Sequence, residues 1–332
     1  MKAIVYRKNG PPDVLTCEEI EKPVPGDQEV LIKVHAAAVN PLDVHVLKGG
    51  PLIFRLLFRG PKLKQPGVDC AGVVEAVGPA VTQFKVGESV FGNCRGAFAE
   101  YAAAPESRLA PKPASVSFED AAACPVAALT ALQGLRKHGK IQPGQNILIN
   151  GASGGVGTFA VQLGKIFGAH VTAVCSVRNA DIVRSLGADH VIDYATEDFT
   201  QGTERYDLIL DMAGSHPFSV CQRVLTPRGI HVGGGILAGQ KPLLAMFAGL
   251  IAALVRSRFS TQKFVVFMAK GNREDLAFLG ELVANGKLKP VIDKRYSLAE
   301  VPDAIRYQGT WRARGKLVIG LEAQPSITSS SG

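Results

Sequence analysis

The segment Asn150-Gly-Ala-Ser-Gly-Gly-Val-Gly157 decides how this chain folds. An apolar run, Ile147 to Ile149, leads into it and an apolar-periodic segment, Thr158 to Phe167, follows it, which predicts a strand, a glycine turn and a helix. Glycine permits a tight turn and lets the backbone approach a pyrophosphate, whose negative charge meets the N–H groups and positive dipole end of the helix. We therefore expect a dinucleotide-binding loop rather than an ordinary glycine-rich turn, with contacts from Ser153, Gly154, Gly155, Val156 and Gly157.

The composition is that of an ordinary folded core. The chain has 332 residues, 46% hydrophobic and 20% charged, which suits two domains. Its six cysteines lie far apart with no Cys-x-x-Cys pair, so we expect reduced thiols and a cytoplasmic location. The net charge of +8 is moderate and spread along the chain, so binding of a specific nucleic acid is not indicated. The longest apolar run, Leu243 to Val255, is shorter than the roughly 20 residues of a membrane-spanning helix.

The pattern of predicted elements changes near Ala121. Before it, short strands alternate with Pro and Gly punctuation, which indicates a mostly β domain. After it, helices and strands alternate, which predicts a parallel sheet and hence an α/β fold. The later elements are expected at 180–186 (helix), 190–192 and 207–210 (strands), 218–225 (helix), 229–232 and 264–267 (strands), 275–285 (helix), and 290–292 and 316–319 (strands). The two final strands are read as a return to the first domain.

The end of the second strand of the parallel sheet predicts the cofactor. NAD-binding chains usually place Asp or Glu there to hold the ribose hydroxyls, whereas this chain has Cys175-Ser176-Val-Arg178. A hydroxyl and a guanidinium without a carboxylate suit the 2′-phosphate of NADPH. The alternative is that Arg178 is a solvated residue of the next turn. Tyr194, after the third strand, is expected either near the same phosphate or as a plain surface tyrosine.

These residues, with six further motifs, resemble the medium-chain dehydrogenase/reductase superfamily, and within it the zinc-free, zeta-crystallin-like quinone oxidoreductase branch. The motifs are Ala38-Val-Asn-Pro-Leu-Asp43, Pro66-Gly-Val-Asp-Cys-Ala-Gly-Val-Val-Glu75, Val86-Gly-Glu-Ser-Val90, Gly96-Ala-Phe-Ala-Glu-Tyr101, Ala128-Leu-Thr-Ala-Leu132 and Ser185-Leu-Gly-Ala-Asp189. The resemblance implies a GroES-like, mostly β catalytic domain into which a Rossmann domain with a doubly wound parallel sheet is inserted. The expected boundaries are 1–124 and 271–322 for the catalytic domain, 125–270 for the NADPH-binding domain and 323–332 for a disordered tail.

The resemblance also bears on metal. Zinc-dependent relatives carry Cys where this chain has Asn40, His where it has Val68, and a third ligand near Val126, and none of these side chains here is a zinc ligand. We therefore expect no metal. Without a Lewis acid, hydride transfer is expected to an acceptor that is already electron-poor, such as a quinone or an α,β-unsaturated carbonyl.

The resemblance places catalytic candidates in Asn40-Pro-Leu-Asp-Val-His45. Asn40 is expected to hold the nicotinamide ribose or a substrate oxygen, and Asp43 to order the loop. His45 is expected either to donate a proton or to be an ordinary loop histidine. Thr130, read as the start of a helix, and the glycines Gly233 and Gly234 after a strand are expected near the nicotinamide, unless they serve only capping and turn geometry.

Two segments, 49–65 and 241–258, are both apolar and basic, and the sequence does not decide what they bind. They are expected to wall a pocket for a small hydrophobic substrate or form an interface, or else to rest on an anionic membrane surface. The resemblance suggests a homodimer. The alternatives to a reductase are a membrane-associated or RNA-binding protein with little turnover, and an alcohol dehydrogenase that uses NAD(P).

Overall fold

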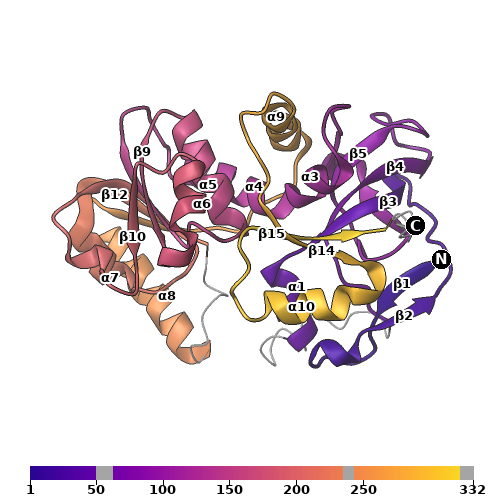
Figure 1. The fold of residues 1–332 in the computed structure, drawn as a ribbon, viewed down its shortest axis with the longest axis horizontal. Coiled ribbons are helices and arrows are strands. Elements are labelled where there is room, and N and C mark those ends of the chain that lie inside the picture. Colours follow the sequence, from indigo (N-terminus) through magenta and orange to yellow (C-terminus); the bar gives the residue numbers. More distant parts are fainter. Residues whose placement is uncertain (50–62, 235–242, 322–332) are drawn as a thin grey trace, which may run out of the picture.

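The computed structural model describes residues 1–49, 63–234 and 243–321. They form two lobes that lie side by side (Figure 1), each built on its own sheet. The strands of one sheet come from residues 29–111 and 292–320, and those of the other from residues 146–266. This order is the one that an inserted domain produces. The expected tail at 323–332 lies outside the described residues.

The lobe whose strands come from residues 29–111 and 292–320 corresponds to the expected catalytic domain and is called the catalytic lobe below. It is built on a seven-stranded sheet. Its strand order is β14 (Ile292–Ser297), β15 (Lys316–Gly320), β3 (Glu29–Val39), β4 (Asp69–Val77), β5 (Ser89–Asn93) and β7 (Leu109–Pro111), with β6 (Tyr101–Pro105) also on β3. A separate two-stranded sheet joins β1 (Lys2–Val5) to β2 (Thr16–Glu19). The helices of this lobe are α1 (Pro41–Lys48), α3 (Phe118–Ala123) and α10 (Val301–Gln308). Strand β15 runs antiparallel to β3, with Leu317 opposite Val39, so the chain does return to its first domain.

The second lobe is a parallel sheet of six strands in the order 3-2-1-4-5-6 of a Rossmann fold. The order in space is β10 (His190–Asp193), β9 (His170–Cys175), β8 (Asn146–Asn150), β11 (Tyr206–Asp211), β12 (Leu225–Gly233) and β13 (Lys263–Val266). Side chains alternate between its two faces: Ile147 and Ile149 belong to one buried cluster and Leu148 to another.

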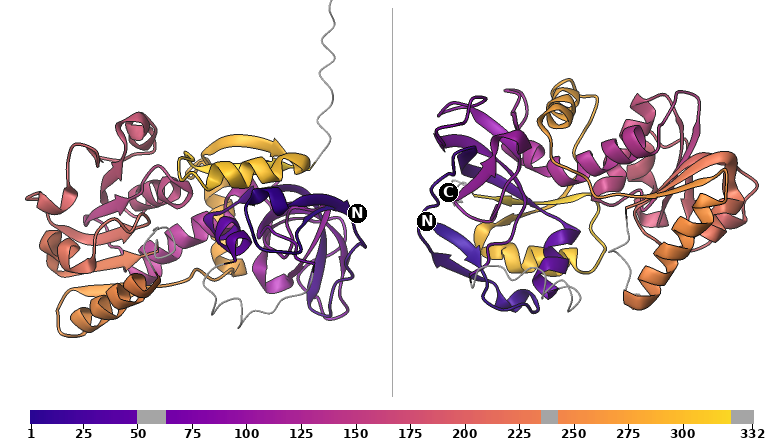
Figure 2. Two further views of the ribbon diagram at one scale, coloured as in Figure 1. Left: turned by 90° about the horizontal axis from the view of Figure 1, so that it is seen from below. Right: turned by 180° about the vertical axis from the view of Figure 1, so that it is seen from behind.

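Helices cover both faces of this sheet. Their bounds are α4 (Pro125–Leu132), α5 (Gly155–Ile166), α6 (Ala180–Ser185), α7 (Phe218–Cys221) and α8 (Leu243–Arg258), while α9 (Arg273–Ala284) follows the last strand. The first cluster takes in α4 and α5, and the second takes in Phe218 of α7 and Ala253 of α8. Figure 2 shows α8, in orange, extending beyond the sheet, with its far end inclined toward the other lobe. No helix in the described part of the chain is long and apolar enough to cross a bilayer.

Three expected elements differ from the structure. The helix expected at 218–225 ends after one α-helical turn and a short 3₁₀ turn, because Leu225 already starts β12. The strand expected at 290–292 begins only at Ile292 and extends to Ser297; Pro290 has no N–H for a sheet hydrogen bond. The helix expected from Asp275 begins at Arg273, because the side chain of Asn272 accepts a hydrogen bond from the backbone N of Asp275 and caps it.

Candidate active site

A cleft of about 2600 Å³ is lined by both lobes. Its lining includes the predicted residues Asn40, His45, Thr130, Ser153, Gly154, Gly155, Val156, Gly157, Ser176, Arg178, Tyr194 and Gly234. Asp43 lies buried behind Asn40, and Gly233 is the last residue of β12, directly before the lining residue Gly234. The structure therefore brings most of the predicted residues to one cavity.

The glycine loop forms the predicted strand, turn and helix. Gly151 takes a positive φ of 83° after β8, and Gly154 caps the N-terminus of α5. A Cβ on Gly157 would lie 2.2 Å from the carbonyl oxygen of Gly151, so only glycine fits there. A twelve-residue helix begins here and directs the N–H groups of its first turn into the cleft. This cradle fits a pyrophosphate.

The second strand of the Rossmann sheet ends as expected without a carboxylate. Strand β9 ends at Cys175, Ser176 caps a 3₁₀ turn that contains Arg178, and both side chains belong to the cleft lining. Asp181 lies on α6, where its fully exposed carboxylate pairs with Arg184. Tyr194 follows the neighbouring strand β10 and is exposed. Ser176, Arg178 and Tyr194 therefore meet at the carboxyl edge of two parallel strands, a set that fits a ribose 2′-phosphate.

Sequence reasoning missed a neighbour of these residues. The side-chain nitrogen Nδ2 of Asn179 donates a hydrogen bond of 2.9 Å to Oγ of Ser153. This bond joins the end of β9 to the glycine loop. The signal available in the sequence was a polar residue four positions after the end of β9.

The structure corrects part of what was expected of the residues near the nicotinamide half of the cofactor. Thr130 is the sixth residue of α4 rather than at its start, because Pro125 begins the helix. Its hydroxyl donates to the carbonyl oxygen of Val126 at 2.7 Å, although the residue still lines the cleft. The backbone N of Gly234 donates to the carbonyl oxygen of Asp211 at 3.0 Å, and this bond fixes the turn after β12.

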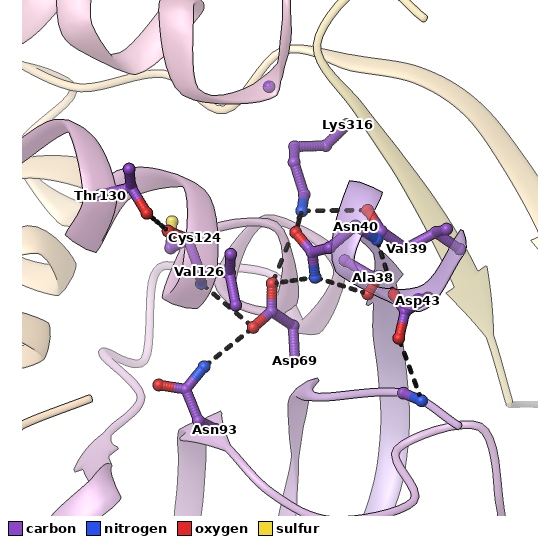
Figure 3. A network of polar contacts seen from close by, with 12 residues as sticks. Ala38, Val39, Asn40, Asp43, Asp69, Asn93, Cys124, Val126, Thr130 and Lys316 are labelled. Atoms are coloured by element: carbon purple, nitrogen blue, oxygen red, sulfur yellow. Dashed lines mark hydrogen bonds and ion pairs between the residues drawn. The ribbon is translucent and has the colours of Figure 1, made fainter. Parts of the chain in front are cut away.

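A buried polar network forms the floor of the cleft on the side of the catalytic lobe (Figure 3). Asp69 accepts hydrogen bonds from Nδ2 of Asn40 at 2.9 Å, from Nδ2 of Asn93 at 3.0 Å and from the backbone N of Val126 at 3.1 Å. Lys316 donates to Oδ1 of Asn40 at 2.6 Å, and its Nζ lies 3.5 Å from Oδ2 of Asp69. All of these side chains are buried, so the ion pair is shielded from water.

The sheet itself explains why these residues meet. Asn40 follows β3, Asp69 starts β4, Asn93 ends β5 and Lys316 starts β15. Because β3 is antiparallel to both β4 and β15, and β5 to β4, these four positions share one edge of the sheet. Asp69 belongs to one of the quoted sequence motifs, whereas sequence reasoning missed Asn93 and Lys316, since strand pairing alone brings them together.

Asp43 is buried beside Asn40 on the side away from the cleft and supports the same floor. Its carboxylate accepts from the backbone N of Asn40 at 2.8 Å and from the backbone N of Gly67 at 3.3 Å, which fixes the start of α1 and ties it to the segment before β4. Burial raises the pKa of Asp43 to about 7; the backbone hydrogen bond from Asn40 opposes the rise, and the negative charge of Asp69 adds to it. Burial also raises the pKa of Asp69, against the positive charge of Lys316.

His45 lines the cleft from α1. Its ring lies 5.6 Å from the ring of Trp311, measured between centroids, in a tilted arrangement. The imidazole therefore stands at the wall of the cavity, beside a side chain from the returning segment of the chain.

The three positions relevant to zinc lie together but do not suit the metal. Asn40, Val68 and Val126 all line the cleft. Two of them are aliphatic, and the amide of Asn40 is engaged by Lys316 and Asp69. In the described ranges there is also no cluster of three or more His, Cys, Asp or Glu side chains that could hold a metal ion. This donor set does not fit a zinc site.

Comparison with known proteins finds family matches in both lobes. Residues 26–114 match the family described as alcohol dehydrogenase GroES-like domain, and residues 186–319 match the family described as zinc-binding dehydrogenase. The chain is similar to quinone-oxidoreductase QR1, chloroplastic, of Triphysaria versicolor, with 36% identity over 91% of this chain and 92% of that protein. It is also similar to NADPH-dependent alkenal/one oxidoreductase, chloroplastic, of Arabidopsis thaliana, with 35% identity over 96% of this chain and 79% of that protein.

A solved structure gives the same result. The quinone oxidoreductase from Coxiella burnetii superposes with a TM-score of 0.85 at 30% identity, over 97% of this chain and 99% of that one. At this coverage the match spans both lobes. The chain thus belongs to the quinone oxidoreductase branch of the medium-chain dehydrogenase/reductase superfamily.

Proposed function

We propose that this protein transfers a hydride from NADPH to a quinone or an α,β-unsaturated carbonyl, without zinc. The observation that carries the proposal is the cleft itself. One end has a dinucleotide cradle without a carboxylate at the ribose position, and the other has Asn40, Val68 and Val126 in place of metal ligands. The relatives named quinone oxidoreductase and alkenal/one oxidoreductase support the same reading.

NADPH rather than NADH is proposed from charge. The guanidinium of Arg178 and the hydroxyl of Ser176 offer charge-assisted and neutral hydrogen bonds to a 2′-phosphate, whereas no acidic side chain at this strand end would hold a free 2′-hydroxyl. Val156 and Gly157 are proposed to hold the pyrophosphate through their N–H groups. Thr130, Gly233 and Gly234 are proposed to contact the nicotinamide half.

The residues of the cleft floor supply position and charge. When bound, NADPH supplies the hydride. Hydride addition leaves negative charge on the substrate oxygen, and a preorganised polar floor lowers the cost of that charge. Asn40, with Asp43 behind it, is proposed to order this floor, and His45 is proposed to give the proton. Electron-poor acceptors suit such a site because no metal donor set is present to polarise a simple carbonyl.

The test compares cofactors in Arg178→Glu. We expect KM for NADPH to rise about 10- to 100-fold, because a charged hydrogen bond is lost and a repulsive charge is added, while KM for NADH changes little. Arg184→Glu is the matched control, since Arg184 lies on the exposed side of α6. Initial rates are measured with a quinone and an alkenal as acceptors. Equal loss with both cofactors, or no turnover of either acceptor by the wild type, would contradict the proposal.

A second role, contact with an anionic membrane surface, is favoured by one feature of α8. Ile251, Leu254 and Val255 of α8 are exposed opposite the buried Ala253 and Ser257, and the exposed Phe259 follows directly after the helix. The net charge of +8 was expected to be spread along the chain, but it is concentrated in residues 212–273, which contain eight Lys and Arg and no Asp or Glu. An apolar face flanked by positive charge suits a headgroup region with anionic lipids. Segment 50–62, expected to contribute, lies outside the described residues.

Vesicle flotation tests this role. We expect the wild type to float with phosphatidylcholine vesicles that contain phosphatidylserine and to remain behind with phosphatidylcholine alone. A variant with Ile251→Ser and Phe259→Ser should not float, while the control Val24→Ser, which changes an equally exposed apolar residue of the other lobe, should. Retention on RNA without vesicle binding would instead favour the nucleic-acid alternative, and binding to neither would remove both.

We also propose a cytoplasmic homodimer. Strand β13 is one of the two edge strands of the six-stranded sheet and has a free edge among the described residues, which can pair with a second copy. The cysteines in the described ranges are free thiols, which suits a reducing compartment. Sedimentation equilibrium decides the assembly: a monomer at micromolar concentration would contradict it.

A further inference from the structure

The lysine at the start of β15 is buried, which is rare for a lysine side chain. Lys316 lines the cleft, yet its side chain is only 3% exposed. A buried ammonium is costly unless it is paired and hydrogen-bonded. Lys316 meets this condition through Oδ1 of Asn40 at 2.6 Å, the carbonyl oxygen of Val39 at 3.2 Å and the carboxylate of Asp69 at 3.5 Å.

The same lysine fixes the orientation of the Asn40 amide. The amide oxygen accepts from Lys316, while Nδ2 donates to Asp69 at 2.9 Å and to the carbonyl oxygen of Ala38 at 3.3 Å. Figure 3 shows the amide between the cation and the anion. A flipped amide would place its NH₂ group against the ammonium and its oxygen against the carboxylate. The network therefore permits only one orientation.

The residue also touches the dinucleotide cradle. The backbone N of Gly315, its neighbour, donates to the carbonyl oxygen of Ser153 at 3.0 Å, and Gly154 and Gly315 form a parallel bridge. A Cβ on Gly155 would lie 3.1 Å from Cδ of Lys316. The start of β15 therefore contacts the glycine loop through its backbone and the cleft floor through its side chain.

We propose that Lys316 is a positioning residue for hydride transfer. It holds the amide of Asn40 in one orientation and fixes the position of Asn40 relative to the glycine loop. The proposal rests on the proposed function for its reaction. Lys316 acts through Asn40, and its role is distinct from charge compensation of Asp69 alone. If charge compensation were its whole role, removing both charges would leave the reaction intact.

The double variant Lys316→Met with Asp69→Asn separates these roles. Lys316→Met alone leaves Asp69 buried without its cation, so it is expected to lose stability, and the double variant is expected to recover it. If Lys316 orients Asn40, kcat of the double variant remains about 10- to 100-fold below that of the wild type, because the amide is no longer held in one orientation. KM for NADPH should change little, and the deuterium isotope effect on kcat should increase as hydride transfer becomes limiting.

Three further measurements complete the test. Lys316→Arg keeps a donor and a charge and should recover part of kcat, and Lys165→Met, which breaks an ion pair with Asp189 at the surface, should leave kcat unchanged. Urea unfolding of each variant without cofactor reports stability separately. A double variant that recovers stability and also has the kcat of the wild type would overturn the positioning role. Absence of turnover in the wild type would overturn the proposed function itself, so the two failures are distinguishable.

Discussion

The two ends of the cleft are built in opposite ways. The dinucleotide end consists of backbone groups from one continuous segment, Ser153 to Gly157, with little charge. The floor at the other end consists of buried charged and amide side chains from four segments that are far apart in the chain: Asn40, Asp69, Asn93 and Lys316. The first end depends on the absence of side chains and the second on their mutual pairing. The two ends should therefore respond differently to substitution.

The largest effect is expected at the floor. Asp69→Asn removes the negative charge that faces Lys316 and leaves a buried ammonium unpaired, which should lower the free energy of unfolding by about 3–5 kcal/mol. Asp181→Asn is the matched control, because the carboxylate of Asp181 is fully exposed and water screens its pairing with Arg184. Urea unfolding measures both. Similar losses in the two variants would show that the floor is not an ion-pair network of this kind.

A smaller effect is expected in the glycine loop. Gly157→Ala places a Cβ 2.2 Å from the carbonyl oxygen of Gly151 and should cost about 1–3 kcal/mol, because backbone must move. Gly154→Ala should keep wild-type stability, since its nearest neighbour would be 3.5 Å away. Thermal unfolding of the protein without cofactor distinguishes them. Equal stability of both variants would mean that the loop backbone can move to accept a Cβ at Gly157 without loss of stability.

The pH dependence of stability should come from the floor. Asp43 has a pKa of about 7 in the folded chain against 3.8 as the ordinary value, so between these values the folded state holds a proton that the unfolded state has lost. The contribution of Asp43 to the free energy of unfolding therefore falls as pH rises from about 4 to about 7 and is constant above that. Asp43→Asn should reduce the difference between about pH 5 and about pH 8. An undiminished difference would assign the titration to another group.

The smallest effect is expected at the edge of the dinucleotide end. Tyr194→Phe removes one hydroxyl from an exposed residue and should weaken NADPH binding about two- to tenfold if that hydroxyl reaches the 2′-phosphate. Fluorescence titration with NADPH and NADH measures the change. Equal affinity of the wild type and the variant for NADPH would make Tyr194 a plain surface residue of the cleft.

The same contrast explains what could be predicted from the sequence. The glycine loop, the alternation of strands and helices, and the bare strand end at Ser176 and Arg178 are local patterns, and the structure reproduces their geometry. Lys316 stands in a short strand whose sequence reads as ordinary, and only its pairing with β3 brings it to Asn40. Thr130 was misplaced within its helix, because the Pro that starts α4 lies further upstream than the apolar pattern suggested.

The apolar helix α8 marks another limit of sequence reasoning. The run from Leu243 to Val255 indicated hydrophobicity but not which face is exposed. The structure shows Ala253 and Ser257 packed inward and Ile251, Leu254 and Val255 outward. Ser257 accepts a hydrogen bond of 2.8 Å from the backbone N of Phe264, which orients the helix on β13. Such an orientation depends on a partner strand that the run itself does not contain.

The most direct test of the central claim follows the hydride itself. The wild-type protein, treated with a chelator, is incubated with NADPH deuterated at the transferred position and with an α,β-unsaturated ketone, and the product is analysed by mass spectrometry and NMR. The proposed mechanism predicts a single deuterium on the β-carbon and an unchanged rate after chelation. A product without deuterium at that carbon, or activity that disappears with the chelator and returns with zinc, would contradict it.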